Sequence, residues 1–454
     1  MPDLPVITEP TRTTPVAFDV DVCVVGGGPA GIGAAVAASR LGASTLLIER
    51  YGFLGGMATA GMVNPFMNYH VEDEPIIAGV FRDWVDGMRR RNGYLDSGRC
   101  GRNIFDTEAA IASAFELCHK AGVQMLLHSF LDRALTEGSR ITHVVTAGKT
   151  RLATQARMFI DCTGDGDLAA LARAPFDIGR ETDHATQPMT LCFNMKGVDW
   201  SQLPTSDDES DLRDRRRAQM QELYDRAKAT GRIECPRHNV LFFSCVQDDE
   251  IHFNTTRVVG RDATDSLGLT AAELEGRRQA EQFVSWLRDE VPGFASAYLS
   301  VTAAQIGVRE SRRVRGLYEL TEDDVLSCRK FADGIARAHY AIDIHNPTGS
   351  GTEIKRLPPG DWYEVPYRCL VPPSIANLLV GGRCIGADHV AHSSLRVMPI
   401  AAAVGEAAGT AAAMAVRQNI APAELDSTAL IRQLVEQGQS LVPTCEVDTA
   451  DRSA

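Results

Sequence analysis

The sequence lacks several features that would place it in a common class of protein. Its 454 residues contain no C-x-x-C pair, and the eleven cysteines stand singly along the chain. That pattern argues against a zinc ribbon and a dithiol redox centre, and it favours reduced, buried thiols. The first ten residues, MPDLPVITEP, contain neither a basic nor an apolar segment, so no secretory signal is expected.

Positive charge and long apolar runs are also scarce. The chain has 46 Lys and Arg against 59 Asp and Glu, a net charge of −13, so we expect no nucleic-acid partner. The longest apolar run, residues 399–416, is rich in Ala and Gly and contains Glu406, which predicts a close-packed internal helix and no membrane span. His389 and His392 lack a third ligand at a convincing spacing, so no metal site is expected. These features together predict a cytoplasmic protein.

The N-terminal part has the pattern of a βαβ unit. An apolar strand is expected over 19–27, a helix of small residues over 29–42, and a second strand over 44–49. Further strands are expected within 122–135, 141–148 and 156–164, and helices over 106–122 and 208–229, with another beginning at Thr270. The run 377–383 restores the buried-strand pattern before the helix at 399–416.

These elements predict an α/β fold in which one domain is interrupted by another. We expect a flexible arm over 1–17, a discontinuous dinucleotide-binding domain of 18–174 and 366–440, an inserted α+β substrate domain of 175–365, and a flexible tail over 441–454.

A glycine motif lies where the first strand meets the first helix. Gly26, Gly28 and Gly31 have the spacing G-x-G-x-x-G, which suits a tight turn, a close approach to a pyrophosphate, and close packing of helix on strand. Glu49 ends the second strand, near the spacing of a carboxylate that binds a ribose hydroxyl. Its negative charge disfavours a 2′-phosphate and therefore NADP at this site. The motif by itself leaves NAD and FAD open.

Three later stretches separate NAD from FAD. They are the loop Gly55–Thr59, the turn Asp161–Gly166, and the strand and turn Leu379–Arg383 followed by a helix. With the first motif, they give a chain that resembles FAD-dependent oxidoreductases of the glutathione-reductase-like superfamily, related to succinate dehydrogenase and fumarate reductase flavoproteins. The resemblance covers residues 19–61, 158–180 and 366–416, and extends to 305–346. It implies bound FAD, a Rossmann-like domain and an inserted substrate domain.

The resemblance also implies residues that contact the cofactor. They are Gly26, Gly28, Ala30, Gly31, Glu49, Arg50, Gly55, Gly56, Thr59, Asp165, Gly382, Arg383, Met398 and Pro399. The arginine acid of fumarate reductases and the histidine that holds FAD covalently in some of them have no clear counterpart here. The dicarboxylate chemistry of that family therefore does not transfer, and we expect FAD to be bound without a covalent link.

Four side chains are candidates for the chemistry: Arg309, His345, His392 and Arg396. Arg309 opens a run of charge, RESRRVR, whose alternate residues Arg309, Arg313 and Arg315 would share one face if the run is extended. The run as a whole favours a ladder of salt bridges, while Arg309 is an anion-binding candidate. His345 is a candidate proton shuttle, His392 a substrate contact, and Arg396 a group that faces the flavin carbonyls.

The sequence thus predicts an enzyme that moves a hydride between a small organic substrate and flavin N5. Only one G-x-G-x-x-G is present, so we expect no stable second domain for NAD(P)H. The expected reoxidant is O₂, a quinone or a partner protein, or NAD(P)H that visits the flavin directly. Two alternatives stay open: a monooxygenase that uses NAD(P)H and O₂, and a non-catalytic FAD-binding redox module. The substrate and the oligomeric state are not determined by the sequence.

Overall fold

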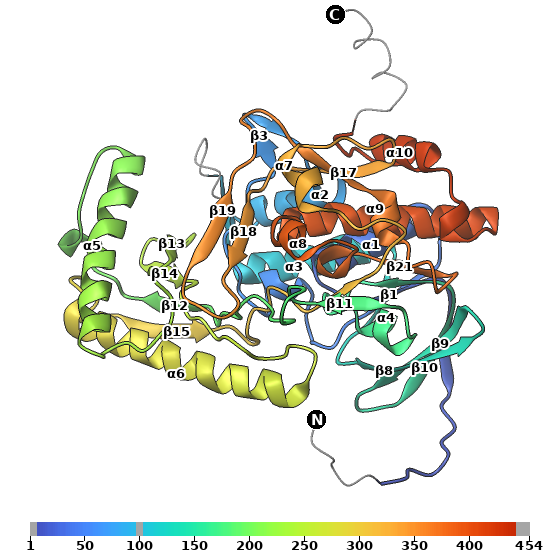
Figure 1. Ribbon diagram of the computed structural model, residues 1–454, viewed down its shortest axis with the longest axis horizontal. Coiled ribbons are helices and arrows are strands. Elements are labelled where there is room, and N and C mark those ends of the chain that lie inside the picture. Colours follow the sequence, from blue (N-terminus) through green and yellow to red (C-terminus); the bar gives the residue numbers. More distant parts are fainter. Residues whose placement is uncertain (1–6, 97–102, 442–454) are drawn as a thin grey trace, which may run out of the picture.

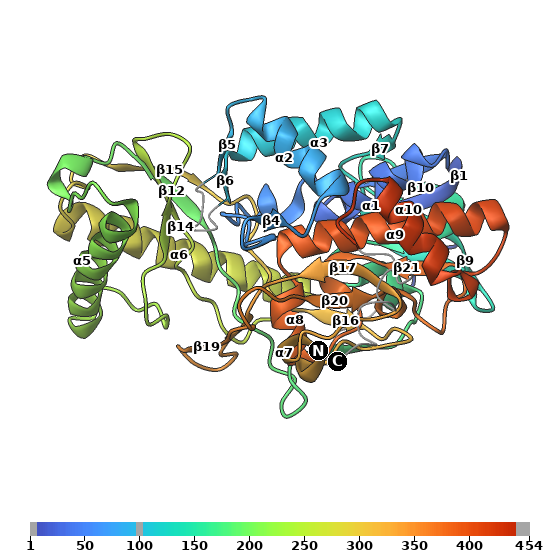
Figure 2. The ribbon, with the colours of Figure 1, turned by 90° about the horizontal axis from the view of Figure 1, so that it is seen from above.

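The computed structural model describes residues 7–96 and 103–441, and its elements form two groups (Figure 1). A seven-stranded sheet with helices from both ends of the chain forms the first group. Helices α5 (Glu209–Ala229) and α6 (Ser266–Glu290) and a four-stranded sheet form the second. Figure 2, seen from above, again places this second group to one side.

The first sheet is parallel at its centre. Its strands are β1 (Val16–Val25), β2 (Thr45–Ile48), β7 (Gln124–Leu126), β8 (Phe130–Glu137), β9 (Arg140–Ala147), β10 (Leu152–Asp161) and β21 (Leu378–Val380). Strand β1 pairs in parallel with β2 and β10, with Val22 opposite Thr45 and Met158, and β21 pairs in parallel with β10. Strands β8 and β9 are antiparallel. The apolar C-terminal half of β1 is buried, as expected for a strand covered on both faces, and the predicted α/β class is confirmed.

Two helices of small residues cross against each other beside this sheet. They are α1 (Pro29–Arg40) and α9 (Met398–Gln418). A Cβ atom on Gly405 would lie 2.0 Å from the carbonyl oxygen of Ala30, and one on Gly33 would lie 2.4 Å from that of Ala402. The two backbones are therefore in direct contact, which explains the Ala and Gly content of both segments. Helix α9 is long and apolar enough to cross a membrane, but its most apolar window is wholly buried in the protein, as predicted for an internal helix.

The second group has an aromatic core. Its sheet has the order β13-β14-β12-β15 and is antiparallel, with strands β12 (Phe193–Lys196), β13 (Phe242–Ser244), β14 (Glu250–Phe253) and β15 (Tyr298–Thr302). The rings of Phe193 and Phe253 stack with centroids 4.9 Å apart, and Phe283 of α6 packs against Tyr224 of α5. These buried apolar side chains form a cluster distinct from that of the first sheet.

The remaining elements are shorter. The helices are α2 (Gly79–Arg89), α3 (Thr107–Ala121), α4 (Asp167–Leu171), α7 (Glu322–Leu326), α8 (His389–Leu395) and α10 (Ser427–Glu436). The strands are β3 (His70–Val71), β4 (Glu74–Pro75), β5 (Tyr94–Asp96), β6 (Asn103–Phe105), β11 (Phe176–Ile178), β16 (Arg312–Val314), β17 (Gly334–Ala338), β18 (Ile342–His345), β19 (Thr352–Lys355) and β20 (Tyr363–Pro366).

The domain limits drawn from the sequence stay a prediction. Buried apolar side chains such as Val314, Ala336 and Val365 belong to the cluster of the first sheet, although they fall inside the predicted substrate domain. Of the predicted arm, residues 1–6 lie outside the described part of the chain, and β1 already begins at Val16. Residues 442–454 of the predicted tail also lie outside it.

Three local predictions need correction. Helix α6 begins at Ser266, where Asp265 accepts a hydrogen bond from the Gly268 N–H, so the predicted capping box at Thr270 lies inside the helix. The run 122–135 holds two strands, because His128 turns the chain with a φ of 53°. Of the nine cysteines in the described residues, eight are buried as expected and Cys245 is half-buried; Cys100 and Cys445 lie outside this part of the chain.

Candidate functional site

The turn between β1 and α1 is shaped by its glycines. Gly26 has a φ of 100°, and a Cβ atom on Gly31 would lie 1.7 Å from the Gly26 carbonyl oxygen. Gly28 is the N-cap of α1, and no side chain caps the helix. A Cβ atom on Gly28 would approach only the Cα atom of Gly56, at 3.8 Å, so this side of the turn is open. The first turn of α1 therefore presents its N–H groups and its positive dipole end to an approaching anion.

Glu49 follows β2 and is fixed by the same turn. Its Oε2 atom accepts a hydrogen bond from the Gly27 N–H at 2.6 Å, and Oε1 accepts one from the Tyr51 N–H at 2.9 Å. The side chain is only 5% exposed, and burial raises the pKa of Glu49 even though these hydrogen bonds act in the opposite direction. Each carboxylate oxygen has a second lone pair, which can accept a hydrogen bond from a ligand hydroxyl.

A cavity of about 680 Å³ runs past this turn. That volume lies within the range of small-molecule and cofactor sites, roughly 300 to 1,000 Å³. Its lining combines segments that are far apart in the sequence, namely 25–30, 48–51, 56–67, 129–131, 162–167, 237–243, 305–309, 340–354, 381–383 and 396–401. Both groups of elements contribute, so the cavity lies where they meet.

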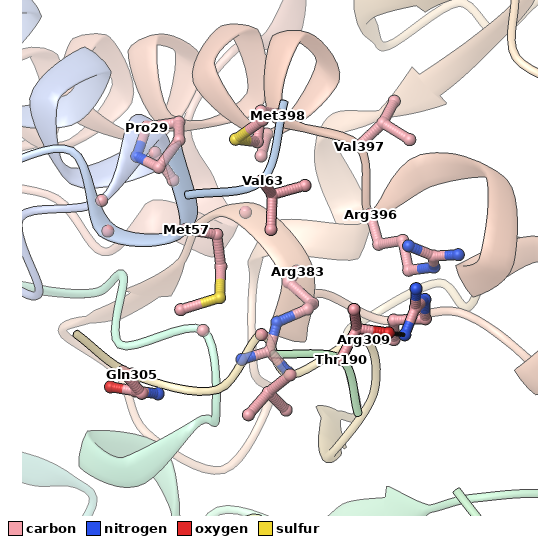
Figure 3. A pocket seen from close by; sticks show the side chains of 18 of the residues that line it. Pro29, Met57, Val63, Thr190, Gln305, Arg309, Arg383, Arg396, Val397 and Met398 are labelled. Carbon is pink, nitrogen blue, oxygen red and sulfur yellow. Dashed lines mark hydrogen bonds between the residues drawn. The ribbon is translucent and has the colours of Figure 1, made fainter. Parts of the chain in front are cut away.

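A second helix begins at the cavity. Val397 is the N-cap of α9 and has no side-chain cap, and Val397 and Met398 both line the cavity. Figure 3 shows Pro29, at the start of α1, close to Met398, with Met57 and Val63 beside them. Two uncapped helix N-termini thus face one cavity, and both favour negative charge there.

Arg383 reaches the cavity from the loop after β21. Its guanidinium donates to Asp165 Oδ1 at 2.8 Å and to Ser311 Oγ at 2.9 Å. Burial would raise the pKa of Asp165, but the charge of Arg383 and the hydrogen bond from Ser311 bring it below its ordinary value. Asp165 does not line the cavity, so its role in this structure is to hold Arg383 in place.

The end of the cavity away from Glu49 carries arginines. The Arg309 guanidinium donates to the Pro188 carbonyl oxygen at 2.7 Å and to Thr190 Oγ1 at 2.6 Å. Burial and the charges of Arg396 and Arg237 lower the pKa of Arg309 to about 9. Figure 3 shows the side chains of Arg309 and Arg396 next to each other. The buried Nε atom of Arg396 has no hydrogen-bond partner in the described protein.

A carboxylate stands beside these arginines. Tyr340 Oη donates to Asp343 Oδ2 at 3.0 Å, and His345 Nε2 and Arg396 Nη2 lie 3.6 and 3.9 Å from the same oxygen. Burial would raise the pKa of Asp343, but His345, Arg396 and Tyr340 hold it well below its usual range. Burial and the charge of Arg309 lower the pKa of His345 to about 3. His345 is therefore neutral near pH 7, and its Nδ1 atom accepts from Arg257 at 3.2 Å.

Most of the residues expected at the site do line the cavity. The lining includes Gly26, Gly28, Ala30, Glu49, Arg50, Gly56, Gly382, Arg383, Met398, Arg309, His345 and Arg396. The residues that do not line it are Gly31, Gly55, Thr59, Asp165, Pro399 and His392. Thr59 donates to the Leu54 carbonyl oxygen, so its hydroxyl supports the glycine loop from behind.

Two predictions about the catalytic candidates need correction. His392 is fully buried in α8, where Nε2 lies 3.0 Å from the Arg383 carbonyl oxygen, so it does not reach a substrate in the cavity. The lowered pKa of His345 means that it does not carry a charge near neutral pH, although it does line the cavity.

The charged run 309–315 is extended only in β16, and this breaks the predicted shared face. Arg313 pairs with Glu310 at 2.6 Å instead of lining the cavity beside Arg309. Arg312 and Arg315 form ion pairs with Asp167 and Asp177. The salt-bridge interpretation thus fits these three residues, and Arg309 stands apart from them.

Several cavity residues were missed by the sequence reasoning. They include Met57, Asp167, Thr190, Arg237, Asn254, Gln305, Tyr340 and Asp343. Arg237 lies in the loop segment CPRHN, which has no periodicity or motif that marks it. Asp343 does have a signal, because it lies two residues before His345 on one strand, and alternate strand residues point to the same face.

Comparison with known proteins identifies a family to which the sequence is similar. A family model described as FAD dependent oxidoreductase matches residues 21–436. A geranylgeranyl bacteriochlorophyll reductase-like protein from Thermoplasma acidophilum is similar in structure, at 12% identity and a TM-score of 0.45, over 95% of this chain and 94% of that one. The flavin-dependent brominase Bmp2 is similar at 11% identity and a TM-score of 0.44, over 92% and 83% of the two chains. The aromatic hydroxylase CabE, from angucycline biosynthesis, is similar at 12% identity and a TM-score of 0.44, over 92% and 66%.

Proposed function

The chain belongs to the family of FAD-dependent oxidoreductases, and we propose that it transfers a hydride between a small organic substrate and its FAD. The observation that carries this proposal is the cavity of about 680 Å³ that the two groups of elements share. One end of the cavity is formed by the open glycine turn and Glu49. The other end is lined by polar side chains of both groups, among them Arg237, Asn254 and Arg309.

The residues present fit the cofactor. The open side of Gly28 and the uncapped start of α1 suit the pyrophosphate, and Glu49 suits a ribose hydroxyl. The uncapped N-terminus of α9 suits the electron-rich end of the flavin. When bound, FAD supplies two-electron chemistry that amino-acid side chains lack.

The chain's own part in the reaction is to bind, orient and shield the substrate. The segments 237–243, 305–309 and 340–354 line one end of the cavity and provide its contacts to the substrate. Asp343, ionised at neutral pH, is the group placed to hold a substrate hydrogen-bond donor. The electron acceptor we propose is O₂, a quinone or a redox partner protein. A closer relation to the succinate dehydrogenase and fumarate reductase flavoproteins is part of the same proposal and rests on the motifs in 19–61, 158–180 and 366–416.

The visible spectrum of the purified protein tests the proposal. It is recorded without oxygen, before and after addition of NADH, NADPH and a panel of small organic acids, amines and alcohols. We expect a yellow protein whose flavin absorbance is bleached by an organic substrate. Bleaching by NAD(P)H alone would favour a monooxygenase, and a flavin that no reductant reaches would favour a non-catalytic redox module.

A further inference from the structure

The cavity end that lies away from Glu49 has a charge pattern opposite to that of the whole protein. The chain carries a net charge of −13, yet three guanidinium groups, those of Arg237, Arg309 and Arg396, line this end. We call these three residues the basic end. The facing acid is Asp343, which lies 3.9 Å from Arg396. A cleft with an excess of one charge concentrates ligands of the opposite charge.

Two of these arginines are not neutralised by the protein. In residues 7–96 and 103–441, neither Arg237 nor Arg309 forms an ion pair with a carboxylate; Arg309 donates to neutral oxygens of Pro188, Thr190 and Asn254. The Arg237 Nε atom donates to Asn239 at 3.4 Å, and the Arg237 side chain is buried. Buried cations without a counter-ion are costly, and a bound anion would remove that cost.

The neighbouring titratable group does not supply a counter-ion beyond Asp343. His345 is neutral, since its pKa is lowered to about 3, so it adds no charge of either sign at neutral pH. Three cations then face one carboxylate. The basic end has a net positive charge and lines the cavity, and the fork geometry of guanidinium groups matches carboxylate oxygens.

In the described part of the chain, the neighbours of Asp343 contact only one of its two carboxylate oxygens. Tyr340, His345 and Arg396 all approach Oδ2, and among the described residues no hydrogen bond is made to Oδ1. Asp343 lines the cavity, so a ligand can reach this ionised carboxylate. An ionised carboxylate only accepts hydrogen bonds, so its natural partner is a hydroxyl or an amino group on the ligand.

We propose that the basic end binds the carboxylate of a small organic acid, and that Asp343 accepts a hydrogen bond from a hydroxyl or amino group on the carbon next to it. The apolar side chains of Leu241 and Ile354 line the same cavity and suit the short carbon skeleton of such an acid. This inference rests on the proposed function and names its substrate class: 2-hydroxy or 2-amino carboxylates.

Three probes of nearly equal shape test it by calorimetric titration of the FAD-loaded protein. They are 2-hydroxyisobutyrate, pivalate, which has a methyl group in place of the hydroxyl, and 2-hydroxyisobutyramide, which has no charge. Neither carboxylate has a hydrogen on the carbon next to its carboxyl group, so the hydride transfer proposed here does not consume them. We expect 2-hydroxyisobutyrate to bind most tightly, pivalate about tenfold more weakly, and the amide more weakly still.

Two variants separate the two halves of the site. Arg237→Gln should weaken both carboxylates about tenfold or more and leave the amide nearly unchanged. In Asp343→Ala no side-chain oxygen remains to accept a hydrogen bond from the ligand hydroxyl. The preference for 2-hydroxyisobutyrate over pivalate should then disappear, while pivalate binds at least as well as before. Arg315→Gln, at an exposed ion pair with Asp177, is the matched control and should change nothing.

Three results would overturn the inference. Equal binding of 2-hydroxyisobutyrate and 2-hydroxyisobutyramide would show that no carboxylate site exists. Binding of inorganic phosphate as tight as that of 2-hydroxyisobutyrate would show an unselective anion site. Loss of FAD from Arg237→Gln would show that this arginine serves the cofactor. A protein that does not retain FAD at all would instead refute the proposed function, before any titration begins.

Discussion

The two groups of elements are packed by different kinds of contact. Helices α1 and α9 meet through backbone atoms, and a Cβ atom on Gly409 would lie 2.0 Å from the Ala34 carbonyl oxygen. The second group is filled by large rings, with Phe283 packed against Phe193, Tyr224 and Trp286. Backbone contact leaves only one arrangement of the two helices, whereas rings fill volume and can repack. The first group thus holds the glycine turn in one position at the cavity, and the second group forms part of the cavity wall.

The largest effect should come from removing a ring in the second group. Phe283→Ala leaves a cavity in the aromatic core and should lower the free energy of unfolding by about 3–5 kcal/mol. The folded fraction should still contain FAD in full, because Phe283 does not line the cofactor cavity. Chemical denaturation and the ratio of visible to ultraviolet absorbance measure both. Loss of FAD from the folded protein would mean that the two groups are not independent.

The dependence of stability on pH should differ between the two groups. Glu406, buried in α9, accepts hydrogen bonds from the Val80 N–H at 2.8 Å and from Gln439 at 2.6 Å, and burial raises its pKa to about 7. The folded state thus binds a proton that the unfolded state has lost, so stability should fall, by on the order of 2–3 kcal/mol, as pH rises from about 5 to 8.

A matched substitution and a residue of the second group sharpen this test. Glu406→Gln should flatten the decline above pH 5, as measured by denaturation at several pH values. The effect of His252 on the pH dependence of stability has the opposite sign. Burial lowers the pKa of His252 to about 3, so its contribution to stability is lost as pH falls below about 6.5. An unchanged pH profile in Glu406→Gln would mean that this carboxyl group is ionised in the folded protein at neutral pH.

A single methyl group should disturb the contact between α1 and α9. A Cβ atom on Gly405 would lie 2.0 Å from the Ala30 carbonyl oxygen, so Gly405→Ala should cost about 2 kcal/mol of stability and lower the FAD content. Gly351→Ala is the matched control, since nothing lies within 4 Å of the added atom. Equal stability and equal FAD content in the two variants would contradict the backbone-contact description.

The smallest change is the loss of one charge at the glycine turn. Glu49→Gln keeps the shape of the side chain but replaces one carboxylate oxygen by an NH₂ group, which donates hydrogen bonds. The one remaining oxygen cannot replace both acceptors, so either the Gly27 or the Tyr51 N–H loses its partner. We expect FAD affinity to fall about tenfold, and the free energy of unfolding of the cofactor-free protein to fall by about 1 kcal/mol, because one N–H group loses its acceptor. Fluorescence titration of that protein with FAD measures the affinity. A variant with wild-type affinity would exclude a role for this carboxylate.

Much of the first group could be predicted from the sequence. The strand, helix and strand expected over 19–27, 29–42 and 44–49 appear as β1, α1 and β2, displaced by a few residues at their ends. The helix expected at 399–416 is α9. These predictions succeeded because glycine spacing and apolar periodicity are local properties, and each glycine has a steric reason that can be read from its neighbours along the chain.

The basic end could not be assembled in the same way. Arg309 and Arg396 were candidates, but Arg237 and Asp343 join them only because a loop of the second group and strand β18 come together at the cavity. Burial also decided which candidates remain: it removed His392 from the cavity and lowered the pKa of His345.

The sequence by itself determined the cofactor end: a glycine turn between strand and helix, a carboxylate after the second strand, and a late helix of small residues. The tertiary structure decided the composition of the basic end: which further side chains line it, and which of the candidates reach the cavity. The physical reason is the distance along the chain between the residues that set each property. Turn geometry and helix packing depend on nearby residues, whereas burial, counter-ions and the shape of a cavity depend on segments that meet only in the folded chain.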